Sequence, residues 1–92
     1  MIKSFKHKAL RRLFEHDERK GLNADHVERL ENILSMLSAA EALDELNLPS
    51  LKLHPLKGEL KGFHAVRVRA NWRITFRFDG GNVYDVDLVD YH

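Results

Sequence analysis

The 92-residue sequence contains no cysteine, only two prolines, and no apolar run long enough to cross a bilayer. Without cysteine, the chain has neither a disulfide framework nor thiol chemistry. Without a membrane-spanning run or a signal-peptide core, it is expected to be cytoplasmic and to have no membrane partner. With 43% hydrophobic and 32% charged residues, the composition indicates one small folded domain over residues 1–92.

The common signatures of metal and cofactor sites are also missing. The six histidines include no pair at the i, i+4 spacing of helical zinc sites, and there are no cysteine ligands. The glycine pair at 80–81 is followed by no helical pattern, so it is not a phosphate-binding loop. We therefore expect no metal and no cofactor.

Charge is present in segregated blocks, although the net charge is only +1. Residues 1–20 carry a net charge of +4 and residues 47–78 a net charge of +6. The blocks 21–46 and 79–92 carry −5 and −4. Such a pattern is most often a solvated surface, but it also allows a basic face that attracts a polyanion.

The last thirty residues alternate between apolar and polar side chains, as half-buried antiparallel strands do. The stretch 72–78 predicts one strand with Trp72, Ile74, Phe76 and Phe78 on one face and Arg73, Thr75 and Arg77 on the other. The residues D-G-G-N at 79–82 favour a tight hairpin. On the returning strand, alternation predicts that Tyr84, Val86 and Leu88 share a face.

The first fifty residues are predicted to be mainly helical. Residues 1–5 are expected to form an edge strand or an extended lead-in, with Ser4 capping a helix over 6–15 and Gly21 ending that region. Asn23 is expected to cap a helix over about 24–38, and a shorter helical pattern covers 39–46. Residues 51–58 are expected to be a loop. The fold class is therefore α+β, with an N-terminal strand and two to three helices packed on a small antiparallel sheet.

One histidine, two cations and a short acid-phenol-imidazole run are the candidates for chemistry: His54, Lys57, Arg73, Asp90, Tyr91 and His92. Taken singly, each is typical of a solvent-exposed side chain. Taken together, they are the groups that cleave RNA without a metal. A base removes the 2′-hydroxyl proton, an acid protonates the leaving 5′-oxygen, and cations stabilise the charge of the transition state.

Four sequence runs carry a resemblance to a known family. They are M-I-K-S-F-K-H-K at 1–8, K-L-H-P-L-K-G at 52–58, V-R-A-N-W-R-I-T-F at 68–76 and V-D-Y-H at 89–92. In order and spacing they resemble the HigB toxins of the RelE-like superfamily, also known as plasmid maintenance killer proteins. The resemblance covers essentially the whole chain and implies the RelE-like fold.

The resemblance implies a toxin that cuts mRNA codons in the ribosomal A site. Family motifs fall on His54, Lys57 and Arg73 and on the run Asp90, Tyr91 and His92. We assign His54 and His92 to proton transfer, with Asp90 as a base or as the group that orients an imidazole. Lys57 and Arg73 would stabilise phosphate charge, and Tyr91 would position the base or the ribose.

The same resemblance implies partners. They are a helix-turn-helix antitoxin of the HigA type, the 70S ribosome and mRNA, with operator DNA bound only through the toxin–antitoxin complex. Two other functions on the same fold stay open at this point. One is a ribosome- or RNA-binding module without catalysis, and the other is a corepressor that acts only with its antitoxin.

Overall fold

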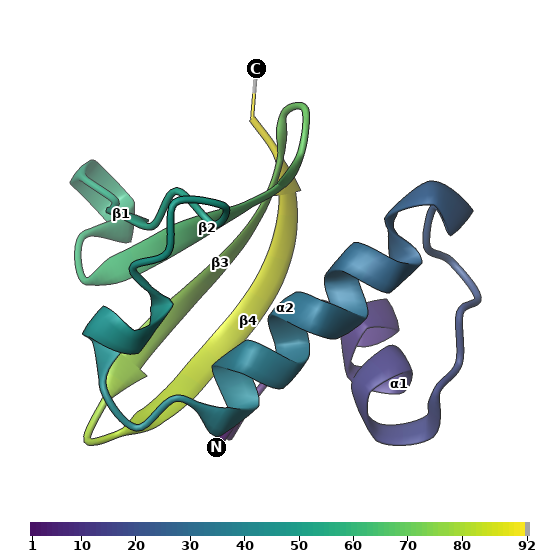
Figure 1. The fold of residues 1–92 in the computed structure, drawn as a ribbon, viewed down its shortest axis with the longest axis horizontal. Coiled ribbons are helices and arrows are strands. Elements are labelled where there is room, and N and C mark those ends of the chain that lie inside the picture. Colours follow the sequence, from purple (N-terminus) through teal and green to yellow (C-terminus); the bar gives the residue numbers. More distant parts are fainter. Residues whose placement is uncertain (92) are drawn as a thin grey trace.

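Two helices lie on one side of a four-stranded antiparallel sheet in the computed structural model, which describes residues 1–91 (Figure 1). The helices are α1 (Lys8–His16) and α2 (Val27–Ala39), and the strands are β1 (His54–Pro55), β2 (Phe63–Arg69), β3 (Trp72–Asp79) and β4 (Asn82–Asp90). Three short 3₁₀ helices connect them: η1 (Ala24–His26), η2 (Leu43–Leu46) and η3 (Gly58–Leu60). The strands neighbour one another in chain order, and the α+β prediction is confirmed.

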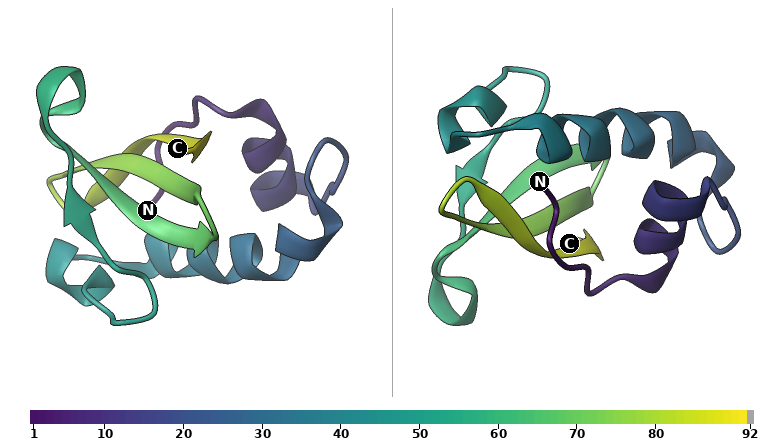
Figure 2. Two further views of the ribbon diagram at one scale, coloured as in Figure 1. Left: turned by 90° about the horizontal axis from the view of Figure 1, so that it is seen from above. Right: turned by 90° about the horizontal axis from the view of Figure 1, so that it is seen from below.

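The core lies between α2 and the sheet, with α1 packed against α2 and β4 (Figure 2). The predicted apolar stripe of α2 is buried, with Leu30, Ile33 and Leu37 fully so. On the sheet side, Ile74 and Phe76 of β3 are fully buried against it. None of the helices in residues 1–91 has the length and apolar character needed to cross a membrane.

The two faces of β3 are as predicted, but on β4 the prediction is wrong for Tyr84, whereas Val86 and Leu88 do share the face turned to the core. A bulge shifts the β3–β4 register between Thr75 and Arg77, and Asp85 adopts a left-handed conformation there with φ of 57°. The extra residue puts Val83 and Val86 on the same, buried face. Tyr84 instead lies opposite Arg77, on the face turned away from the helices.

Of the two expectations for the N-terminal segment, the structure has the extended lead-in and no separate strand. This segment runs along β4 and makes two isolated parallel bridges, Ile2 to Val83 and Phe5 to Val86. Ser4 caps no helix, because its hydroxyl accepts from the backbone N–H of Asp85 at 2.9 Å. The α1 cap is His7, whose Nδ1 accepts from the Leu10 N–H at 3.2 Å.

Helix ends and the following loop differ in detail from the prediction. Helix α1 ends at His16, with Asp17 in the left-handed cap position, so Gly21 lies beyond it. The predicted cap of Asn23 is present, but it begins η1, which leads into α2. The short helical pattern over 39–46 is only the 3₁₀ helix η2. The predicted loop at 51–58 contains β1, the fourth strand of the sheet.

Candidate active site

The sheet face turned away from the helices carries Arg67 of β2 and Arg73 and Arg77 of β3, and we call it the arginine face. Directly paired residues of an antiparallel sheet project to the same side, so the register defines rows across this face. One row contains His54, Ala65, Thr75 and Asp87. The next contains Arg67, Arg73 and Val89. The small side chains Ala65 and Thr75 are buried between larger neighbours.

His54 stands on the short edge strand β1 and is held in a defined orientation. Pro55 favours an extended backbone at His54, which lets the two residues pair with β2. The Nδ1 atom of His54 lies 3.0 Å from the carbonyl oxygen of Lys52. A neutral His54 that donates from Nδ1 to this carbonyl keeps a lone pair on Nε2, as a general base requires.

Lys57 follows three residues later and precedes the 3₁₀ helix η3. Its side chain is exposed and has no hydrogen bond or ion pair within the described chain. Gly58 comes next with φ of 67°, a left-handed conformation that glycine adopts readily. His54 and Lys57 therefore belong to one corner of the molecule, at the β1 edge.

Arg73 lies in the centre of the sheet, and its guanidinium is tied to the β2–β3 turn. The Nη1 group donates to the carbonyl oxygen of Ala70 at 2.7 Å and to that of Trp72 at 3.0 Å. These two bonds use the two hydrogens of Nη1 and leave the donors of Nε and Nη2 for another acceptor. That remaining edge has the geometry of a bidentate contact with a phosphate.

The chain end is joined to the same turn. The backbone N–H of Tyr91 donates to the Asn71 carbonyl at 2.8 Å, and the Tyr91 side chain is 41% exposed. Asp90 is paired in register with Trp72, so it belongs to the face that the helices cover and not to the arginine face. His92 lies outside the described residues.

The predicted residues thus form two groups on either side of β2. His54 and Lys57 lie at the β1 edge, and Arg73 lies beside the turn that holds the backbone of Tyr91. Because neighbouring strands are about 4.8 Å apart, β1 and β3 are separated by roughly 10 Å. A substrate that contacts both groups must extend across the sheet.

Two residues beside this site were not among the sequence-based candidates. Arg67 lies directly opposite Arg73, between the two groups. Its place opposite Arg73 depends on the register shift in β2 between Arg67 and Arg69, which the alternation of Val66 and Val68 does not indicate. The other is His64, whose Nδ1 is buried without a hydrogen-bond partner in residues 1–91. Burial lowers the pKa of His64 below its usual value of 6.5, and the charge of nearby His54 lowers it further.

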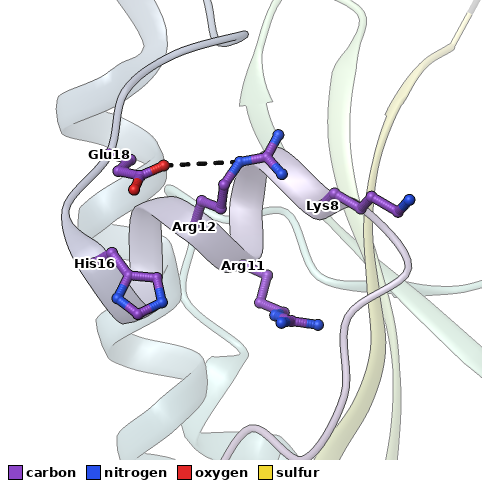
Figure 3. A pocket seen from close by; sticks show the side chains of 5 residues that line it. All are labelled: Lys8, Arg11, Arg12, His16 and Glu18. Carbon is purple, nitrogen blue, oxygen red and sulfur yellow. Dashed lines mark ion pairs between the residues drawn. The ribbon is translucent and has the colours of Figure 1, made fainter.

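A second basic region lies on α1 (Figure 3). A hollow of about 430 Å³ is lined by four side chains of the helix and one of the segment after it: Lys8, Arg11, Arg12, His16 and Glu18. Glu18 lies 3.9 Å from the guanidinium of Arg12, so it offsets part of the positive charge. Among residues 1–91, no group of three or more histidine and acidic side chains is placed to hold a metal ion.

Comparison with known proteins gives one consistent answer. Residues 3–92 match the family model described as the RelE-like toxin of the type II toxin–antitoxin system HigB. The chain is 48% identical to Endoribonuclease HigB of Proteus vulgaris over 92 residues, which is all of both chains. It is 34% identical to Toxin HigB-1 of Vibrio cholerae over 83 residues, covering 88% of this chain and 87% of that one.

The fold also matches a solved structure. The crystal structure of a YafQ mutant from E. coli superposes with a TM-score of 0.65 at 16% identity. The match covers 98% of this chain and 91% of the other. At this low identity the similarity concerns the fold alone.

Proposed function

This chain belongs to the HigB family of RelE-like toxins of type II toxin–antitoxin systems, and from that membership we propose that it is an mRNA endonuclease acting in the ribosomal A site. The observation that carries the proposal is the arginine face, where an oriented imidazole and a guanidinium with a free donor edge lie on one surface. The full-length similarity to a protein named as an endoribonuclease supports the same activity.

The chemistry follows from the side chains. In one sequence of steps, His54 takes the proton of the ribose 2′-hydroxyl, and the oxygen attacks the adjacent phosphorus. His92 donates a proton to the leaving 5′-oxygen, so the products are a 2′,3′-cyclic phosphate and a 5′-hydroxyl. Lys57 and Arg73 stabilise the added negative charge on the phosphate as the bond forms. Proton transfer of this kind typically contributes about 10²–10⁴ in rate.

Asp90 and Tyr91 complete the proposed site. Asp90 acts as a base or orients an imidazole, and Tyr91 positions the ribose or the base. The register that pairs Asp90 with Trp72 favours the orienting role, since this carboxylate approaches from the side of the sheet away from the arginine face.

The proposed partners follow from the family. The toxin is held inactive in the cytoplasm by a HigA-type antitoxin, and only the complex binds operator DNA. The free toxin binds the 70S ribosome and the mRNA in it. A ribosome-binding module without catalysis and an antitoxin-dependent corepressor are the alternatives that the experiment must separate.

The test uses ribosomes that hold an mRNA with an open A site, with the RNA products mapped at nucleotide resolution. The untagged protein should cut within the A-site codon, and Lys57→Ala should cut about 100-fold more slowly, since one donor to the developing charge is lost. Lys61→Ala is the matched control, because Lys61 is also an exposed lysine beside η3.

Each alternative has its own outcome. Tight ribosome binding without RNA cleavage by the unmodified protein would show that the chain is a ribosome-binding module and not an enzyme. Neither binding nor cutting by a folded protein would leave the corepressor. Equal cleavage rates for Lys57→Ala and Lys61→Ala would show that Lys57 is not part of the active site, although the protein would still be a nuclease.

A further inference from the structure

Arg67 occupies the position that joins the two groups of site residues. It is the direct cross-strand partner of Arg73 on β3. It is also two residues along β2 from Ala65, the partner of His54, so Arg67 and His54 are diagonal neighbours. Diagonal neighbours are about 7–8 Å apart, within reach of a long side chain. One anion can therefore be reached by Arg67, Arg73 and His54 together.

Among residues 1–91, nothing neutralises the charge of Arg67. Within residues 1–91 its side chain forms no hydrogen bond or ion pair. The carboxylates on the same part of the sheet are engaged elsewhere. Asp85 lies 3.7 Å from Arg77, and the Oδ1 of Asp87 accepts from the Leu88 N–H at 2.9 Å. Like charges placed directly opposite each other destabilise a strand pair, so the Arg67–Arg73 pair is unfavourable until an anion joins it.

The backbone that carries Arg67 is fixed from both sides. Its N–H donates to the carbonyl of Leu51 at 2.6 Å, and its own carbonyl accepts from the Arg29 guanidinium at 3.0 Å. Arg73 is fixed in turn by its two bonds to the β2–β3 turn, and its Nε–Nη2 edge remains available. The guanidinium of Arg73 and the backbone of Arg67 are thus held on neighbouring strands, and the Arg67 side chain keeps all its donors for an anion.

We propose that Arg67 and Arg73 form a two-guanidinium clamp that holds the scissile phosphate of the RNA on the arginine face. The inference rests on the proposed nuclease function and adds Arg67 to the substrate-binding residues. Arg67 supplies hydrogen bonds and charge to the phosphate that His54 and Arg73 also approach, so it acts on the transition state as well as on binding.

The first measurement is the single-turnover cleavage rate at saturating protein, on ribosomes with an open A site. Arg67→Gln should lower the rate about 10- to 100-fold, the loss expected for charge-assisted hydrogen bonds to a phosphate. Arg67→Lys, which keeps the charge but loses the planar fork, should recover part of this loss. Arg69→Gln is the matched control, because it removes an exposed arginine two residues away on the same strand, and it should change the rate less than about twofold.

The second measurement needs neither ribosomes nor RNA. Because Arg67 has no counter-ion among residues 1–91, Arg67→Gln should unfold at the same or a higher urea concentration than the unmodified protein. Inorganic pyrophosphate should stabilise the unmodified protein more than sodium chloride of equal ionic strength does, and Arg67→Gln should lose that extra stabilisation. A merely structural role for Arg67 predicts the opposite, a lower urea midpoint for the variant.

The outcomes separate the inference from the proposed function. If the unmodified protein cleaves RNA and Arg67→Gln cleaves it as fast as Arg69→Gln does, the two-guanidinium clamp is contradicted. The proposed nuclease function is then still supported. If the unmodified protein does not cut, the nuclease fails. In that case, the pyrophosphate comparison still decides whether Arg67 and Arg73 bind a phosphate group.

Discussion

At the scale of single residues, His64 carries the clearest energetic conflict in the molecule. Its ring stacks on Phe76 with centroids 6.2 Å apart, next to the core, while its Nδ1 has no partner in the described chain. A buried polar atom without a hydrogen bond destabilises the folded state.

The pH dependence of stability should report on His64. Its pKa is lowered in the folded protein, first by burial and then by the charge of His54, so the unfolded chain binds more protons at mildly acidic pH. Stability from this residue is therefore fully present above pH 6.5 and is lost as the pH falls below that value. His64→Phe keeps the stacking and removes the titration.

Urea unfolding at a series of pH values from 8 to 5 checks this expectation. The unmodified protein should lose stability over the acidic part of the range, and His64→Phe should lose less. His16→Phe controls for the removal of an exposed histidine. Parallel pH profiles for all three proteins would contradict the assignment.

At the scale of secondary-structure elements, one side chain ties α2 to the site-bearing strand. The Arg29 guanidinium donates to the carbonyl oxygens of Val68 at 3.2 Å, Arg67 at 3.0 Å and Ser50 at 2.7 Å. Two of these carbonyls lie at the β2 irregularity between Arg67 and Arg69. The third belongs to the segment that leads into β1, so Arg29 supports both strands that carry the candidate site.

Arg29→Met should destabilise the protein by about 2 kcal/mol, because three carbonyls lose a charged donor. The free energy of unfolding in urea measures the change. Arg11→Met is the matched control. Arg11 lies on α1 with its side chain 63% exposed and pairs with Glu15, so its loss should be below about 0.5 kcal/mol. Equal effects of the two substitutions would show that the carbonyl contacts contribute nothing beyond a surface charge.

At the scale of the whole molecule, positive charge is present on two separate surfaces. One is the arginine face, and the other is the hollow on α1 lined by Lys8, Arg11 and Arg12 (Figure 3). The α1 side chains are exposed and lie on a different element from the candidate site. Contacts of this kind attract a polyanion without contributing to the chemical step.

The double variant Lys8→Gln, Arg11→Gln should therefore weaken ribosome association but leave the cleavage rate at saturating protein unchanged. Each lost phosphate contact should reduce the slope of log affinity against log salt by about 0.7–0.9. Binding measured at several salt concentrations gives the slope, with Lys61→Gln as the control. An unchanged slope for the double variant would show that the α1 surface does not contact RNA phosphates.

Sequence reasoning succeeded where the structure depends on local periodicity. The faces of β3, the buried stripe of α2 and the cap at Asn23 follow from side-chain spacing and from short-range hydrogen bonding. It placed Tyr84 of β4 on the wrong face, because the bulge depends on a left-handed conformation at Asp85. An aspartate within a strand pattern does not by itself predict that conformation. The helix cap at His7 was missed for a similar reason, since Ser4 is the commoner capping residue.

The sequence by itself determined the fold class, the family and the hydrophobic core, since each depends on patterns within single elements. Only the tertiary structure decided which polar side chains meet. The pairing of β1 with β2 brings His54 diagonal to Arg67, and the pairing of β2 with β3 places Arg67 opposite Arg73. A shift of one residue in either register would put these side chains on opposite faces of the sheet. Register depends on contacts between distant segments, so it cannot be derived from the periodicity of one strand.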